Sequence, residues 1–459
     1  MRIGSSLPSA ALYRQRGRPL AVETAALLAR MSVPPAAARK AQLDGLVQTL
    51  LAAGIWTKLD AFYILAAHDA QAARLNLVPW TGTVTNLIPN STMQGADVAA
   101  NTAPTGWNTS MGSSGLTRSI VGVGTMGGLP YVDMRLAGTL AQSGVVIAFS
   151  WAPTSATPAV GGGRYTHGVS FALTAGSFGT TQGAVNLLTV AADGTTTVDN
   201  ASGPNIFGGL TVTLARQQLT MVASATAAQI APRLRMTFGA SGTAVDFTLR
   251  VAAPQLVRMD VPGNFIPTSG AAAAQVQTLY RFDLTAVNSP AFTMDRGFTG
   301  NGTTSYLDTN ADPSLDFART SLNSAAYGVW VSSETPSSAR ALGQGDSTTV
   351  VSPRSPADQA NIRVHDGGTL VGAAPSSIGL TAGNRSGATA RQMYRNGNVA
   401  ASDAFPSSSM STALWLLRAL SYYPGQISAA FAGASLTAAE HIALHGALRT
   451  YLIGVGAST

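Results

Sequence analysis

Cysteine is absent from the 459-residue chain, which excludes disulfides and thiolate metal sites but leaves the redox compartment open. Charged side chains make up only 11% of the residues, and lysine occurs only at Lys40 and Lys58. No apolar run reaches the roughly 18 residues that a membrane span needs. The opening MRIGSSLPSAAL is too polar for the core of a signal peptide. We therefore expect no membrane span, and a chain made in the cytoplasm that leaves it, if at all, within a larger assembly.

The net charge of +7 raises the question of nucleic-acid binding, because clustered lysine and arginine neutralise phosphates. The distribution argues against it. Apart from Arg14, Arg16 and Arg18 the arginines are scattered singly, and RNA-module and zinc-finger patterns are missing. We expect no nucleic-acid partner, whereas an acidic polysaccharide or another subunit suits a basic face equally well.

Glycine is abundant, with 48 residues, and much of the polar remainder is Ser, Thr and Asn. Such a composition favours strand-rich sandwiches with many turns. The length leaves room for two or three domains, each large enough to bury a core.

Short strand-like runs recur between Gly and Ser turns in the middle of the chain, at spacings typical of a β-sandwich. The clearest are residues 131–138, 145–151, 168–173, 210–215, 219–225 and 245–256. Residues 122–127 spell GVGTMG, the glycine spacing of a dinucleotide-binding loop, but Pro130 and a strand-like run follow in place of a helix. We predict a turn there and no cofactor.

Residues 281–310 alternate apolar β-formers with turn residues, which predicts strand–turn–strand units opening another antiparallel sandwich. Further strands are predicted at 325–333, 361–368 and 391–401, the last with a two-residue hairpin turn at Asn396-Gly397. The run 413–423, ALWLLRALSYY, is apolar enough to lie in the core.

Helices are expected on both sides of these strands. An apolar stripe predicts a helix that Gly54 ends, and its apolar face continues through 58–67; the stripe residues are Leu43, Leu46, Val47, Leu50 and Leu51. Thr437 and Glu440 form a capping box for a final helix. Residues 1–34 predict an extended attachment arm in which Arg14, Arg16 and Arg18 dock on a neighbouring subunit, the alternative being a frayed terminus.

Two segments resemble a known family. AVNSPAF (286–292) with DRGFTGNGTTSYLDT (295–309), and the ending FAGASLTAAEHIALHGALRTYL (431–452), resemble the concanavalin A-like, laminin-G-like jelly rolls of bacteriophage and prophage structural proteins. In that family the first run follows closely on a helical lead like residues 58–77. Here about two hundred residues, an ordinary domain, intervene. The resemblance thus implies an inserted domain.

The insert has its own resemblance. NLIPN (86–90), the Gly106-Trp107 pair and FIPTSGAAAA (265–274) resemble carbohydrate-binding-module-like jelly rolls that recur in phage tail and spike proteins. We therefore predict a mainly β protein of two antiparallel β-sandwich (jelly-roll) domains, one inserted into the other, with flanking helices. The predicted boundaries are an arm at 1–34, a helical lead at 35–79, the insert at 80–280 and the resumed sandwich with its final helix at 281–459.

Candidate catalytic and metal sites are weak. Glycoside hydrolysis needs two carboxylates across the bond, but the three glutamates are far apart, which leaves pairs such as Asp308 and Asp312. DTNAD (308–312) begins like a calcium loop but has Pro313 where that loop needs glycine. His441 and His445 lie four apart without the internal glutamate of a metalloprotease. We predict no catalytic residue, no metal site and no cofactor, and leave a structural calcium open.

Sugar binding calls for aromatic faces and planar polar groups. The candidates by residue type are Trp80, Trp107, Tyr131, Tyr165, His167, Tyr394, Tyr422 and Tyr423. Each of them could equally pack in a core.

The resemblances imply a non-enzymatic, homo-oligomeric protein on the exterior of a phage or phage-like particle such as a gene transfer agent. It would serve as head spike, tail fibre or decoration subunit, contact other virion proteins, and bind host capsular or surface polysaccharide for attachment. A polysaccharide depolymerase and a purely structural connector are the alternatives.

Overall fold

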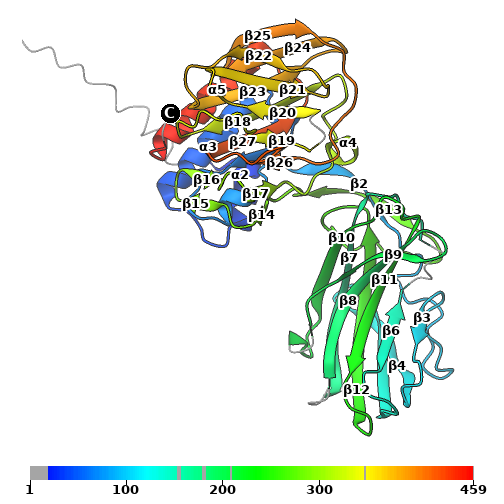
Figure 1. Ribbon diagram of the computed structural model, residues 1–459. Helices are drawn as coiled ribbons and strands as arrows, with labels where there is room; N and C mark the ends of the chain where they lie inside the picture. The colour runs from blue at the N-terminus through cyan, green and yellow to red at the C-terminus, as the bar shows by residue number, and fades with distance from the viewer. Residues whose placement is uncertain (1–18, 152–156, 178–181, 207–208, 346–347, 458–459) are drawn as a thin grey trace, which may run out of the picture. The chain divides into compact units, whose positions relative to one another are not determined.

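The computed structural model describes residues 19–151, 157–177, 182–206, 209–345 and 348–457 (Figure 1). Strands account for 44% and helices for 12% of the chain, and the sheets are antiparallel, which confirms the predicted mainly β class. No helix within these residues is long and apolar enough to cross a membrane.

The chain divides into two compact units. The first consists of Met1–Trp80 together with Tyr280–Thr459, and the second of Thr81–Leu279. The second unit therefore interrupts the first, and its ends lie within one residue of the insert expected at 80–280. Strands β2 (Trp80–Asn86) and β13 (Ala273–Leu279) pair with each other and bring the two ends of the insert together.

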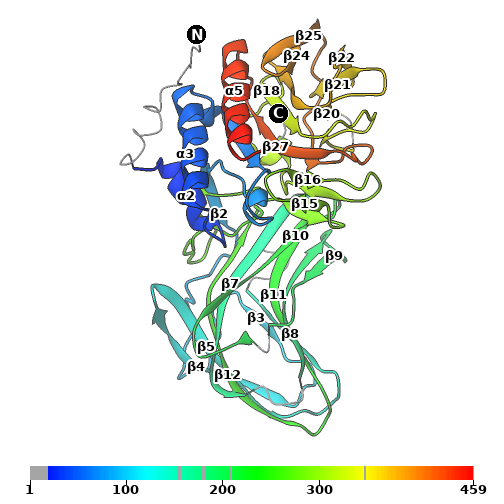
Figure 2. The same cartoon turned by 90° about the vertical axis from the view of Figure 1, so that its left-hand side faces the viewer.

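The first unit is a sandwich of two sheets with helices on one side (Figure 2). The sheet that faces the helices, here called the helix-backed sheet, has the order β15-β16-β27-β18-β23-β24-β25, with β1 also paired to β27. Its strands are β1 Leu59–Ile64, β15 Ala291–Thr293, β16 Gly297–Thr299, β18 Ala325–Val331, β23 Gly379–Arg385, β24 Ala390–Arg395, β25 Asn398–Ala404 and β27 Gln426–Gly433.

The other sheet, here called the open sheet, has the order β14-β17-β26-β19-β20-β21-β22. Its strands are β14 Thr285–Val287, β17 Tyr306–Asp308, β19 Leu342–Gly343, β20 Thr349–Ser352, β21 Gln359–Val364, β22 Leu370–Ala373 and β26 Trp415–Leu416. Side chains such as Leu307, Val329 and Ile362 form the core between the two sheets. A second core joins the helix-backed sheet to the helices.

The helices are α2 Val22–Arg30, α3 Ala37–Ala52, α4 Pro313–Asp316 and α5 Ala438–Gly454, with 3-10 turns at Trp56–Lys58 and Ala72–Arg74. The predicted stripe on α3 is buried at four of its five residues, Leu51 being partly exposed. The predicted capping box of α5 is present: the Thr437 side chain accepts from the Glu440 N–H, and the Glu440 carboxylate accepts from the Thr437 N–H at 2.7 Å.

Two predictions about the leading segment are wrong. The proposed extended arm contains α2, because VETAALLAR is rich in helix formers and buries Leu27. The helical face expected through 58–67 contains strand β1. Its residues are all buried because Phe62 faces the helices while Tyr63 faces the core between the sheets, so no polar alternation marks the strand. Arg14, Arg16 and Arg18 lie outside the described residues.

The second unit is a sandwich of two five-stranded sheets, ordered β10-β7-β12-β5-β4 and β3-β6-β11-β8-β9. Its strands are β3 Asn108–Ser110, β4 Leu116–Met126, β5 Leu129–Thr139, β6 Val146–Ser150, β7 Arg164–Ser177, β8 Gln182–Ala192, β9 Thr197–Ser202, β10 Ala215–Val222, β11 Gln229–Phe238 and β12 Ala244–Val257. Alternate residues such as Val132, Phe171 and Leu234 fill the core between the sheets.

Most predicted strands of the insert are present, with one exception. The run 210–215 joins a strand only at Ala215, where β10 begins. The turn predicted for the glycine pattern at 122–127 is wrong for most of its length: the pattern lies mainly in strand β4, and Gly127 and Gly128, both with positive φ, make the turn to β5. Asn396 and Gly397, with φ of 48° and 84°, form the predicted hairpin turn between β24 and β25.

Candidate functional site

Four of the eight predicted sugar-binding residues are buried. Tyr165 and His167 point into the core of the second unit, where the His167 Nε2 accepts a 2.6 Å hydrogen bond from the Trp151 indole. Tyr394 stacks on a histidine of α5, and Tyr423 lies in the core between the sheets of the first unit. These side chains occupy inward positions and leave no ring face for a sugar, so the prediction fails for them.

The two predicted tryptophans are partly buried. Trp107 packs 5.3 Å from the ring of Trp151, and its indole N–H donates to the Asn90 carbonyl oxygen at 3.0 Å. Trp80 has the guanidinium of Arg281 5.0 Å from its ring centroid. Both rings are therefore engaged by the protein itself.

Tyr131 lies on strand β5 in the second unit and is partly exposed. The guanidinium of Arg250 stacks 3.7 Å from the ring centroid and is held there by two 2.8 Å hydrogen bonds to the Asp133 carboxylate. Gly124 pairs with Tyr131, and a Cβ there would come within 2.8 Å of the tyrosine hydroxyl. The glycine thus leaves room for the ring, which is a single partly exposed ring beside Arg250 and has no second aromatic partner among the described residues.

Tyr422 belongs to a group of aromatic side chains on the open sheet. Its ring centroid lies 6.2 Å from that of Tyr306, which in turn lies 5.9 Å from Trp415 in an edge-to-face arrangement. All three residues are partly exposed. Together with Arg418 they are here called the aromatic cluster.

Strand alternation places these rings on the outer face of the open sheet. Leu307 and Leu416 pair in register and point into the core between the sheets. Their neighbours Tyr306 and Trp415 therefore point the other way, away from that core. Tyr422 is added by a β-bridge with Arg418, in the segment after β26.

Arg418 lies at the centre of the cluster. Its Cζ is 4.2 Å from the ring centroid of Trp415, 4.6 Å from that of Tyr306 and 5.1 Å from that of Tyr422. A guanidinium within about 6 Å of an aromatic face is attracted by the ring quadrupole. Three such contacts hold the planar group at the surface in a fixed orientation.

The strand register defines which residues share this outer face. Trp415 pairs with Gly343, which pairs with Val350, which pairs with Arg363. On its other side, Trp415 pairs with Asp308. Among the described residues of this row, Asp308 supplies the one carboxylate. Its Oδ1 accepts a 2.8 Å hydrogen bond from the Asn310 N–H.

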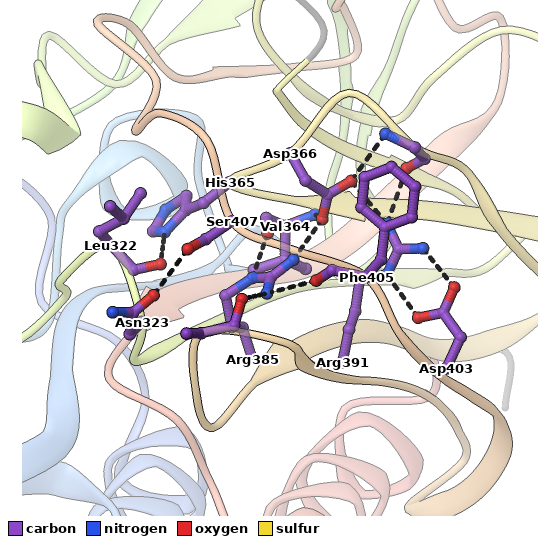
Figure 3. A network of polar contacts seen from close by, with 12 residues as sticks. Leu322, Asn323, Val364, His365, Asp366, Arg385, Arg391, Asp403, Phe405 and Ser407 are labelled. Carbon is purple, nitrogen blue, oxygen red and sulfur yellow. Dashed lines mark hydrogen bonds and ion pairs between the residues drawn. The ribbon is translucent and has the colours of Figure 1, made fainter.

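A second group of charged residues lies inside the first unit and has a different character (Figure 3). Asp366 is fully buried between Arg385 and Arg391, each 2.6 Å from one of its oxygens. Arg391 also binds Asp403 at 2.5 Å. The backbone carbonyl oxygens of Val364 and other residues accept further hydrogen bonds from the guanidinium N–H groups. The charges are matched, and all but Asp403 are shielded from solvent, so this network stabilises the sandwich and offers no free group for chemistry.

The remaining candidates have structural roles. Asp312 caps α4 by accepting from the Ser314 N–H at 2.9 Å, and burial raises the pKa of its carboxyl. The His445 ring stacks on Trp330 with the two ring centroids 5.3 Å apart. Burial lowers the pKa of His441 to about 3. Among the described residues no three His, Cys, Asp or Glu side chains gather as a metal site.

The sequence identified one ring of the aromatic cluster and missed the others. Trp415 and Arg418 were assigned to the core with the apolar run 413–423, and Tyr306 was assigned to a strand. One signal was available: alternation from Leu414, buried, through Trp415 to Leu416, buried, turns the tryptophan outward.

No family model and no curated protein matches this chain. Among solved structures, a carbohydrate-binding module of the β-sandwich superfamily is 12% identical with a TM-score of 0.24, and the match covers 36% of this chain and 62%, less than two thirds, of that chain. A structure described as CBM4 is 17% identical with a TM-score of 0.20, covering 37% of this chain and 98% of that one. The CBM22-1-CBM22-2 tandem domain of Paenibacillus barcinonensis Xyn10C is 10% identical with a TM-score of 0.25, and the match covers 77% of this chain and 98% of that one. TM-scores this low carry no argument about the present chain.

Proposed function

We propose that this protein is a non-catalytic glycan-binding protein and that the aromatic cluster contacts the sugar. The observation that carries the proposal is the convergence of three partly exposed rings on one guanidinium at the outer face of the open sheet. Partly exposed aromatic rings offer an apolar body and a polar edge, and a few fixed polar groups beside them give orientation to a bound molecule. That combination matches the alternating C–H faces and hydroxyls of a sugar.

The arrangement of acids supports binding without cleavage. Hydrolysis of a glycosidic bond uses two carboxylates about 5 to 9.5 Å apart on either side of the bond. The described row of the open sheet that contains Trp415 offers one, Asp308. The buried Asp366, by contrast, is held by two arginines and cannot approach a sugar.

The sequence resemblances support a location for the protein on a phage or phage-like particle. Residues 286–309 and 431–452 resemble phage and prophage structural proteins, and both segments lie in the unit that bears the aromatic cluster. We place the protein on the exterior of a phage or phage-like particle, as a head spike, tail fibre or decoration subunit that attaches the particle to host polysaccharide. Many copies on one particle would raise the apparent affinity of a weak site without any new contact.

The test is binding of the full-length protein to a glycan array and to purified capsular polysaccharide. Trp415→Ala and Tyr422→Ala are each expected to weaken binding tenfold or more, because each removes a ring that contacts the sugar. Tyr131→Ala is the matched control, since it removes a partly exposed tyrosine stacked with an arginine in the other unit. Its binding should stay within twofold of the unmodified protein.

Three outcomes would contradict the proposal. Loss of binding in Tyr131→Ala but not in Trp415→Ala would move the site to the insert. Release of reducing ends from the polysaccharide would identify a depolymerase. Binding to purified particles but to no glycan would identify a structural connector.

A further inference from the structure

Arg418 is surrounded by aromatic rings and has no acidic side chain within ion-pair distance among the described residues. Several other arginines of the first unit are paired with carboxylates. Arg30 lies 2.5 Å from Asp283, and Arg39 lies 2.6 Å from Asp295. A cation at a partly exposed position, stacked but not neutralised, is available to an anion.

No described residue accepts a hydrogen bond from the Arg418 side chain, whose contacts are with the three rings. Guanidinium N–H donors lie in the plane of the group and fit a carboxylate with two parallel hydrogen bonds. Since contacts with Trp415 and Tyr306 already restrain the Arg418 side chain, less rotamer freedom is lost when an anion binds.

Neighbouring charges narrow the choice of ligand. Arg363 lies in the same register row as Trp415. Asp308, next to Trp415 in that row, adds an acceptor of the opposite sign. The outer face thus presents the Arg418 cation for an anionic group and the Asp308 carboxylate for hydroxyl donors.

We propose that the aromatic cluster recognises a carboxylate-bearing sugar, a uronic acid within an acidic polysaccharide, with Arg418 binding the carboxylate. The inference rests on the proposed function and specifies its ligand. A uronic acid carries both groups that this face selects, an anion and several hydroxyl donors. A nucleic-acid strand offers closely spaced phosphates and fewer hydroxyl donors for the Asp308 carboxylate.

The net charge of the chain also favours an acidic ligand. A net charge of +7 attracts a polyanion over about a Debye length, roughly 8 Å at physiological salt. This attraction raises the encounter rate with any acidic polymer and gives no selectivity by itself. Selectivity for the carboxylate has to come from Arg418, which is what the experiment isolates.

The test uses alginate, a uronic-acid polymer, and the same polymer after reduction of its carboxyl groups, titrated into full-length protein at 0.15 M salt. We expect alginate to bind at least tenfold more tightly than the reduced polymer. Arg418→Gln should weaken alginate binding tenfold or more, and Arg418→Lys, which keeps the charge without the planar fork, severalfold. Arg449→Gln removes the same charge from an exposed position on α5 of the same unit and should stay within twofold.

Each result that would contradict the proposal points to a different explanation. Equal binding of both polymers would overturn the carboxylate while leaving glycan binding intact, and so would glycan-array binding without any alginate binding. Equal losses in Arg449→Gln and Arg418→Gln would reduce the effect to general charge. Tighter binding of single-stranded DNA than of alginate, lost in Arg418→Gln, would make the cluster a nucleic-acid site. Should Arg418→Gln fail to fold, quenching of tryptophan fluorescence in the unmodified protein by glucuronate but not by glucose decides the question.

Discussion

Neutralising Asp366 should destabilise the first unit strongly, although Asp366 is not one of the proposed ligand contacts. The carboxylate is fully buried and accepts from Arg385 and Arg391, both also fully buried, at 2.6 Å. Asp366→Asn preserves the shape of the side chain and removes its charge. Arg391 keeps a second partner in Asp403, whereas Arg385 retains only backbone carbonyl oxygens such as that of Phe405.

The expected loss follows from the charge left behind. Removing one partner of a buried ion pair costs about 3–5 kcal/mol because the remaining charge is no longer compensated. Asp403→Asn provides the matched comparison, since 33% of the Asp403 side chain is exposed and Arg391 still faces Asp366. An exposed ion pair contributes about 1 kcal/mol or less. The two variants remove the same charge from the same network and should differ by at least a factor of three in their cost.

Urea denaturation followed by tryptophan fluorescence measures the difference. With an m-value of about 3 kcal/mol/M, the Asp366→Asn loss lowers the midpoint of the first unit by about 1 to 1.7 M. Trp107 and Trp151 report on the second unit, whose transition should not move. Midpoints shifted equally by Asp366→Asn and Asp403→Asn would show that burial does not set the strength of this network, and the reasoning would be refuted.

Acid should also weaken the first unit, because burial lowers the pKa of His441 to about 3 from its ordinary 6.5, against an opposing effect of a nearby carboxylate. The unfolded chain then takes up a proton that the folded chain does not, so the free energy of unfolding falls as the pH drops from 6.5 toward 3, by up to roughly 1 kcal/mol per pH unit. In His441→Phe, whose ring can still stack on Tyr394, the urea midpoint should depend less on pH between 7.5 and 5. Gly397→Ala should cost about 1–3 kcal/mol in the same assay, since Gly397 has a φ of 84° and a Cβ there would lie 3.0 Å from the Ile442 Cα. Gly446→Ala, where a Cβ meets nothing within 4 Å on helix α5, should stabilise by up to about 1 kcal/mol, and a loss there would contradict the packing described.

The fold was largely predictable because most of its strands are buried on one face and alternate. The runs at 131–138 and 145–151 follow this rule, and so do the hairpin at Asn396-Gly397 and the capping box at Thr437. Strand β1 was not predictable by the same rule. It lies between the helices and the open sheet, so both of its faces are apolar and periodicity does not distinguish it from a helix.

The candidate site was less predictable because it depends on contacts between segments distant in sequence. Alternation turns Trp415 outward, but Leu417 is buried with a φ of 65°, which breaks the alternation before Arg418. The convergence of Tyr306 with Trp415 is fixed by the register of β17 and β26, which no local pattern specifies. Residue type alone selected buried rings such as Tyr423 as readily as exposed ones.

The scarcity of acids links the interior of the first unit to its surface. Burial of a charge requires a partner, so the sandwich engages carboxylates such as those of Asp366 and Asp316 to neutralise arginines inside it. With 21 acids against 28 lysines and arginines, at least seven basic residues have no acidic counterpart, wherever the acids lie. Arg418 is such a residue, and the chain has placed rings rather than a carboxylate around it. Rings hold a guanidinium in position and leave its charge intact, whereas a paired carboxylate would hold it and cancel the charge. An aromatic setting is therefore the one that preserves Arg418 for an anion supplied from outside the protein.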